Sequence, residues 1–197
     1  MMRRTVLLCA IAVLGVGCAS DQPAPTAVEL RVPLFVAGGN GDFNLGTHLT
    51  GDEEVPPRDT RAQGEAIFRV SDDESSVDFR LIASNIDNVI MAHIHCGRFG
   101  ENGPIIMWLY PGTGLTGAPV APGGGPQNGV LASGTFAVPP GAMCLAANVG
   151  RNMPLLEAMR AGLTYVNVHT NDGVAPANTG PGDFPGGEIR GQIDHGR

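Results

Sequence analysis

The sequence lacks a cluster of basic residues. The chain of 197 residues has 12 Lys and Arg against 19 Asp and Glu, a formal net charge of −7. Removal of Arg3 and Arg4 with an amino-terminal signal lowers this charge by two, to −9. Proteins that bind nucleic acid neutralise phosphates with Lys and Arg. We therefore expect no nucleic acid partner.

The sequence also lacks an apolar run long enough to cross a bilayer, which takes about 20 residues. Its longest run covers residues 5–16, after two arginines and before small residues that end at Cys18. This pattern is typical of a bacterial secretory signal, which we place at residues 1–17. We expect lipidation of Cys18, with 18–42 as a tether to the membrane. Simple secretion is the alternative, because lipoprotein signals usually have Leu at the place of Gly15.

Cysteines are few. Of the four, Cys9 lies in the signal and Cys18 is the candidate for lipidation. Cys96 and Cys144 remain, and in an oxidising compartment outside the cytoplasm we expect them to form one disulfide. Two unpaired buried thiols are the alternative. The predicted location is the bacterial cell envelope, in a membrane-anchored form at the outer membrane or periplasm, or in a secreted form.

Glycine and proline are abundant, with 29 and 16 residues, which favours a fold with many tight turns. Apolar residues alternate with polar ones along several short segments, as in half-buried strands. One helix is expected in 152–162, with Asn152 as its N-cap and Gly162 after its end. An antiparallel β-sandwich or barrel with one short helix is therefore predicted. The expected strands are the hairpin around 65–70 and 77–82, then 44–50, 89–96, 104–109, 130–138, 164–170 and 188–193, and a possible edge strand in 28–36.

The alternation also predicts which side chains form the core. We expect a buried set that consists of Phe68, Val70, Phe79, Leu81, Ile90, Ile94, Val166, Val168 and Ile189. Two loops rich in glycine and proline, 111–128 and 171–187, are expected to be irregular. We interpret the first as a surface connection, whereas the second follows His169 directly and is equally a surface connection or the rim of a site.

Three histidines are candidates for a metal site. His93 and His95 alternate with apolar residues of their strand and are therefore expected on its outward face, and His169 is placed likewise. Residues at i and i+2 of a strand can reach one ion, and three imidazoles suit copper or zinc. We predict that all three meet at the outer surface of the sheet. Residues expected to support the rings by hydrogen bonds are Glu188, Gln192, Asn167 and Tyr165.

The alternative is that these histidines bond only water or the neighbouring Tyr165 and Asn167. The other histidines, His48 and His195, are expected to be solvated. Glu53 and Glu54 are adjacent carboxylates, which we interpret as charges at a strand end.

Four segments together resemble the CHRD domain, a family first described in chordin. They are "LTGDEEVPPRDTRAQGEAIF", "AHIHCGRFGENGP", "YVNVHT" and "PGGEIRGQI", and the domain would cover residues 43–197. The resemblance implies an immunoglobulin-like β-sandwich with a distant similarity to copper/zinc superoxide dismutases. It transfers no catalytic residue.

The segment "HIHCGRFGENG" is similar to the copper-binding strand of those dismutases. Their bridging histidine and zinc loop have no counterpart here, and no Gly-x-Ser-x-Gly motif indicates a hydrolase. We therefore lean against an enzyme. Two hypotheses remain, a module that binds copper or zinc outside the cytoplasm, and a structural or adhesive module of the cell envelope that holds no metal.

Overall fold

The computed structural model describes residues 44–139, 142–145 and 152–195. The predicted signal, the lipidation site Cys18, the tether and the possible strand 28–36 lie outside these residues. The described elements are β1 (Asn44–Thr50), η1 (Gly51–Glu53), β2 (Gln63–Val70), β3 (Ser76–Asp87), β4 (Val89–Cys96), β5 (Ile105–Tyr110), β6 (Pro126–Ala137), β7 (Met143–Cys144), β8 (Met153–Pro154), α1 (Leu155–Arg160), β9 (Thr164–Thr170), β10 (Ile189–Gln192) and β11 (Asp194–His195). None of the described helices is long and apolar enough to cross a membrane.

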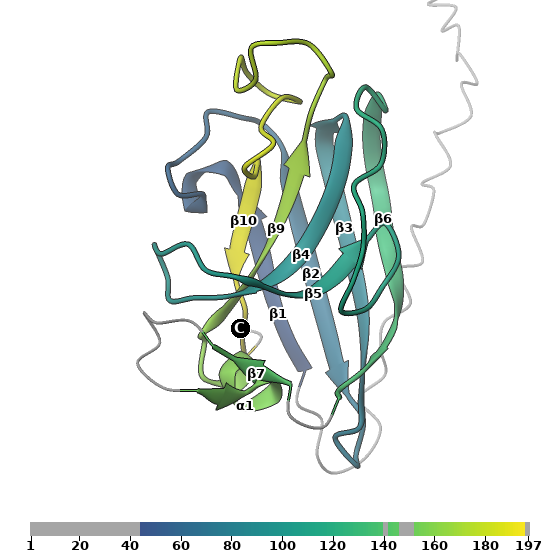
Figure 1. The fold of residues 1–197 in the computed structure, drawn as a ribbon, viewed down its shortest axis with the longest axis vertical. Helices are drawn as coiled ribbons and strands as arrows, with labels where there is room; N and C mark the ends of the chain where they lie inside the picture. Colours follow the sequence, from purple (N-terminus) through teal and green to yellow (C-terminus); the bar gives the residue numbers. More distant parts are fainter. Residues whose placement is uncertain (1–43, 140–141, 146–151, 196–197) are drawn as a thin grey trace, which may run out of the picture. The chain divides into compact units, whose positions relative to one another are not determined.

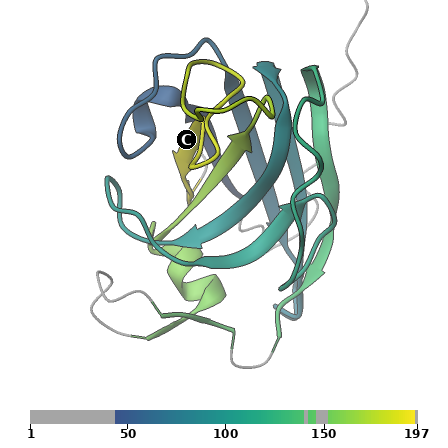
Figure 2. The ribbon, with the colours of Figure 1, turned by 45° about the horizontal axis from the view of Figure 1, so that its top comes forward.

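One antiparallel sheet contains most of these strands, in the order β5-β4-β9-β10-β1-β2-β3-β6, with β11 paired to β1. The sheet curls strongly, so that β5 approaches β6 and the two ends nearly close into a barrel (Figures 1 and 2). The predicted all-β architecture is therefore confirmed. Strand β6 begins at Pro126, earlier than expected, so the end of the loop 111–128 is regular after all. Its register against β3 shifts between Leu81 and Ile82 and between Ala83 and Ile86.

The core lies inside this curled sheet. Phe68 and Phe79 are cross-strand partners in the β2–β3 hairpin, and the Phe79 ring packs 6.1 Å from that of Phe136. All nine residues of the predicted core are buried. The period-two pattern identified this face correctly because each of its strands is apolar on the same side.

Helix α1 begins later than the sequence indicated. Residues Met153–Pro154 pair with β7, so the chain is extended up to Pro154, which takes the N-cap position in place of Asn152. The end of the helix is as expected. Gly162 has a φ of +65°, and the amides of Gly162 and Leu163 donate to the carbonyls of Met159 and Ala158. This is a Schellman C-cap.

The predicted bond between Cys96 and Cys144 is present, with the Cα atoms 5.4 Å apart. It joins the end of β4 to β7 and packs against Met153 and Ala158 in a small apolar cluster. The end of the strand that carries His95 is thereby fixed to the segment that precedes α1.

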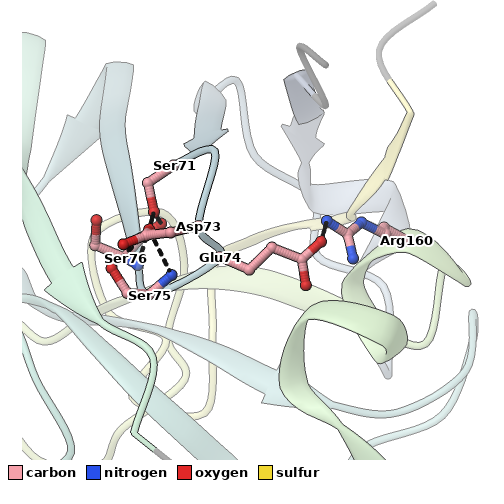
Figure 3. Close-up of polar contacts among 6 residues, drawn as sticks. All are labelled: Ser71, Asp73, Glu74, Ser75, Ser76 and Arg160. Carbon is pink, nitrogen blue, oxygen red and sulfur yellow. Dashed lines mark hydrogen bonds and ion pairs between the residues drawn. The ribbon is translucent and has the colours of Figure 1, made fainter.

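The turn between β2 and β3 is held by side-chain bonds (Figure 3). Asp73 Oδ1 accepts hydrogen bonds from the Ser71 hydroxyl and from the amide and hydroxyl of Ser75, and these donors lower the pKa of Asp73 to about 2. Glu74 then bonds Arg160 at 2.7 Å. The hairpin tip and the end of α1 are thus tied together.

Candidate metal centre

Two neighbouring strands bring three imidazoles together. His93 and His95 lie on β4 and His169 lies on the adjacent β9 (Figure 1). One nitrogen from each ring can be chosen so that all three lie within 4.8 Å of one another. His93 Nδ1 is 3.2 Å from His169 Nε2. This cluster of His93, His95 and His169 is called the histidine cluster below.

The histidine cluster is buried, which corrects the expected position at an outer surface. The exposed fractions of His93, His95 and His169 are 0%, 8% and 6%. Alternation placed the three on the face opposite the core, but loops cover that face. Other residues of β9 and of the start of β10 are buried as well, namely Tyr165, Asn167, Glu188 and Arg190.

Backbone carbonyl oxygens of two of these loops, at Gly103 and Pro185, determine which ring nitrogen of His95 and of His169 carries the proton. His95 Nδ1 lies 2.8 Å from the carbonyl oxygen of Gly103, and His169 Nδ1 lies 2.9 Å from that of Pro185. A carbonyl oxygen only accepts, so each Nδ1 carries the proton and each Nε2 keeps its lone pair. The loop 171–187 therefore contributes to the site, as one of its two interpretations predicted.

Further ring nitrogens have no partner. Nε2 of His93 and Nε2 of His95 are both buried and make no hydrogen bond among the residues that the structure describes. Buried polar atoms are nearly always bonded. His95 Nε2 is therefore free to bind a ligand, whereas His93 faces His169 through its other nitrogen, Nδ1.

The cluster is held in its neutral form. Burial lowers the pKa of His93 to about 3, with a smaller effect from the other two imidazoles. Burial likewise lowers the pKa of His95 to about 4 and that of His169 to about 4, against hydrogen bonds to their Gly103 and Pro185 carbonyls that raise it. Metals bind the neutral imidazole. At neutral pH the site needs no deprotonation to accept an ion.

Aromatic side chains fix the ring orientations. Trp108 meets His93 edge-on, with ring centroids 4.1 Å apart, and it is the cross-strand partner of His93 on β5. The loop 111–128 also packs against the indole, because a Cβ at Gly117 would collide with it. This loop is therefore more than the surface connection we expected.

The sequence from residue 45 to residue 193 matches the model of the CHRD domain. The chain belongs to this family. The match includes all of the histidine cluster and the strands that carry it. Comparison with curated proteins and with solved structures finds no match to the chain. The similarity to dismutases therefore stays a prediction.

Within the CHRD domain, two of the four expected supporting residues contact the imidazoles. Asn167 Oδ1 lies 2.9 Å from His169 Nε2, and the Tyr165 ring stacks on His95 at 4.8 Å. Glu188 instead accepts hydrogen bonds from Thr60, Thr170 and the Gly182 amide. Gln192 donates to the carbonyls of Gly97 and Gly162. Neither side chain bonds a ring among the described residues, so their expected bonds to the rings were wrong.

Glu54 is the residue of this CHRD domain that the sequence argument misjudged. It is 4% exposed, and Oε1 makes no hydrogen bond among the described residues. Burial raises its pKa to about 7, while Arg190, Arg58 and hydrogen bonds from the Val55 amide and the Asn167 side chain lower it. A position after η1, outside any strand, gave no periodicity from which its burial could be inferred.

The remaining histidines lie away from the cluster. His48 on β1 is exposed, as expected. His195 pairs with Leu45 in β11 rather than lying in an irregular tail.

Proposed function

We propose that this CHRD domain binds one transition-metal ion, copper or zinc, through His93, His95 and His169. The observation that carries the proposal is the convergence of three buried, neutral imidazoles. The Nδ1 protons of two of them are already directed to carbonyl oxygens. This leaves the unpartnered Nε2 lone pair of His95 for a ligand, while His169 Nε2 lies beside Asn167 Oδ1 and His93 Nδ1. Such bonds to the second ring nitrogen also orient histidines in known metal sites.

The spacing of the nitrogens supports this proposal. At a metal–nitrogen distance of about 2.0 to 2.1 Å, tetrahedral ligands lie roughly 3.3 Å from one another. The observed 3.2 Å between His93 Nδ1 and His169 Nε2 is close to that value. The third nitrogen, within 4.8 Å, would need a small rotation of its ring. Imidazole favours copper and zinc over calcium and magnesium, which take oxygen ligands.

Trp108 provides the readout for a test. It is the single tryptophan of the chain, and its ring lies against His93. We expect Cu²⁺ to quench its fluorescence in protein purified without a histidine tag, with one equivalent at saturation. Calorimetry with Zn²⁺ should give the same stoichiometry.

Variants separate this site from adventitious binding. His95→Ala should lose most of the affinity for both ions, whereas His48→Ala, which alters an exposed imidazole outside the cluster, should keep it. A wild-type protein that binds neither ion would exclude the metal site. The module would then be structural or adhesive, with the histidines acting as packing residues.

We also propose that the protein is exported and anchored in the bacterial cell envelope by a lipid on Cys18. The apolar run 5–16 and the small residues before Cys18 support this proposal. Metabolic labelling with a fatty acid should mark the wild-type protein and leave Cys18→Ser unlabelled. An unlabelled wild-type protein in the culture medium would indicate simple secretion.

A further inference from the structure

Glu54 is a buried carboxyl that forms no ion pair within the part of the chain that the structure describes. Arg190 and Arg58 act on it electrostatically, but the hydrogen bonds of Arg190 go to Asn102 Oδ1 and to the carbonyl oxygens of Arg98 and Glu101. Its guanidinium lies over the Tyr165 ring, 3.5 Å from the centroid. Arg190, the cation with the largest electrostatic effect on Glu54, is thus held by other contacts.

The backbone is shaped around this carboxyl. Gly187 lies against it, because a Cβ at that position would be 2.3 Å from Glu54 Oε1. The loop that supplies Gly187 also supplies Pro185, whose carbonyl holds His169. Figures 1 and 2 show the segment after η1 and the β9–β10 loop at the same end of the sheet. Glu54 therefore lies against the β9–β10 loop that also holds His169 through Pro185.

Asn167 connects the carboxyl to the cluster. Its side chain lowers the pKa of Glu54 and raises the pKa of His95, and its Oδ1 lies 2.9 Å from His169 Nε2. Asn167 thus acts on both the carboxyl and the histidine cluster. Three neutral imidazoles supply no negative charge, so an ion bound among them would carry its full charge into a site of low dielectric.

We propose that Glu54 is the anion that compensates the charge of the bound ion, acting through Asn167, and that it makes the site prefer divalent over monovalent ions. This inference rests on the proposed metal site. An ionised Glu54 attracts a doubly charged ion about twice as strongly as a singly charged one at the same place. Burial makes that attraction stronger than it would be in water.

The test compares Glu54→Gln, which keeps the shape and removes the charge, with the wild-type protein. Affinities for Zn²⁺, Cu²⁺ and Cu⁺ are measured by competition with chelators. We expect Glu54→Gln to bind the divalent ions 10- to 100-fold more weakly, the usual range for outer partners of a metal site, and Cu⁺ with a much smaller loss. If the variant loses tenfold more affinity for Cu²⁺ than for Cu⁺, the reduction potential of the bound Cu²⁺/Cu⁺ couple rises by about 59 mV.

Two controls make the comparison specific. Glu53→Gln removes the adjacent carboxylate, which accepts a bond from the Gln192 amide, and should leave the ratio of Cu²⁺ to Cu⁺ affinity unchanged. Glu54→Asp retains the charge and should retain most of the preference. Folding of each variant is checked by its disulfide and its thermal unfolding. If Glu54→Gln does not fold, Glu54→Met, which leaves no polar atom unpaired, replaces it.

The outcomes are distinct. A wild-type protein that binds none of the three ions refutes the metal site itself. A wild-type protein that binds, with Glu54→Gln unchanged or with equal losses for all three ions, leaves the metal site standing and overturns the role of Glu54 as the compensating charge.

Discussion

Tyr165 lies flat against His95, with the ring centroids 4.8 Å apart and the planes 10° from parallel. The same phenol ring also carries the guanidinium of Arg190, 3.5 Å from its centroid. Its hydroxyl accepts a hydrogen bond from the Gly103 amide at 3.1 Å. The ring therefore holds one imidazole and one cation in fixed positions.

Substitutions at Tyr165 should separate these contributions. Tyr165→Phe keeps both stacks and loses one hydrogen bond, which should lower the free energy of unfolding by about 1 kcal/mol. Tyr165→Leu also loses the stacks and the contact with Arg190, and should cost about 2 to 4 kcal/mol. Urea denaturation measures both. Equal losses for the two variants would show that stacking contributes nothing.

Acidification should destabilise the protein. The folded pKa values of His93, His95 and His169 lie at about 3, 4 and 4, below the ordinary 6.5. Between these values and 6.5 the unfolded chain binds more protons, so stability falls as the pH falls from about 6.5 to about 4. The raised pKa of Glu54, about 7 against 4.5, opposes this trend between those two values.

Three histidines against one carboxyl leave a net uptake of about two protons on unfolding near pH 5.5, or roughly 2 to 3 kcal/mol per pH unit. Urea midpoints at pH 7, 6 and 5, in the presence of a chelator, should fall accordingly. In Glu54→Gln the opposing carboxyl is absent, so the urea midpoint should decrease more steeply as the pH falls. Midpoints that do not change over this range would contradict the burial of the cluster.

Gly187→Ala should be strongly destabilising. The residue has a φ of +124°, and an added Cβ would meet the Glu54 carboxyl. Gly112→Ala is the control, because Gly112 also has a positive φ but no atom within 4 Å of an added Cβ. We expect Gly187→Ala to lower the free energy of unfolding by about 1 to 3 kcal/mol more than Gly112→Ala does, the usual cost of overpacking. Similar losses of stability for the two variants would mean that the β9–β10 loop shifts away from Glu54 without cost.

The disulfide should support both stability and the metal site. Cys96 and Cys144 are separated by 48 positions, and closure of such a loop corresponds to about 4 kcal/mol in the chain-entropy model. Cys144→Ser should lose a comparable amount in urea denaturation. Because Cys96 follows His95 directly, we also expect weaker Zn²⁺ binding. Unchanged affinity would show that hydrogen bonding to Gly103 alone positions His95.

Phe79→Ala tests the core face. Phe79 is 4% exposed and lies opposite Phe68 in the hairpin. Its truncation should cost about 3 to 5 kcal/mol. An unchanged urea midpoint would contradict the packing described for the curled sheet.

The alternation of side chains predicted much of this fold, because one apolar face per strand is a local property. Strands β1, β4 and β9 begin and end at the residues expected. The same alternation put His93 and His169 on one face. It could not show that loops cover that face, because the cover depends on long-range bonds such as that between His169 and the Pro185 carbonyl. The burial of Glu54 was missed for the same reason, and the Glu188 bonds to Thr60 and Thr170 connect positions that no spacing relates.

The placement of the three histidines on β4 and β9 sets an order of events for the newly made chain. Between His95 and His169 lie the disulfide partner Cys144, helix α1 and the four strands β5 to β8. An ion that arrives before β9 has docked can meet only the two imidazoles of β4, without His169 and without the loop 171–187. Full coordination is thus available only to a chain whose carboxyl-terminal third has already folded. Loading would come last, as the closing step of maturation.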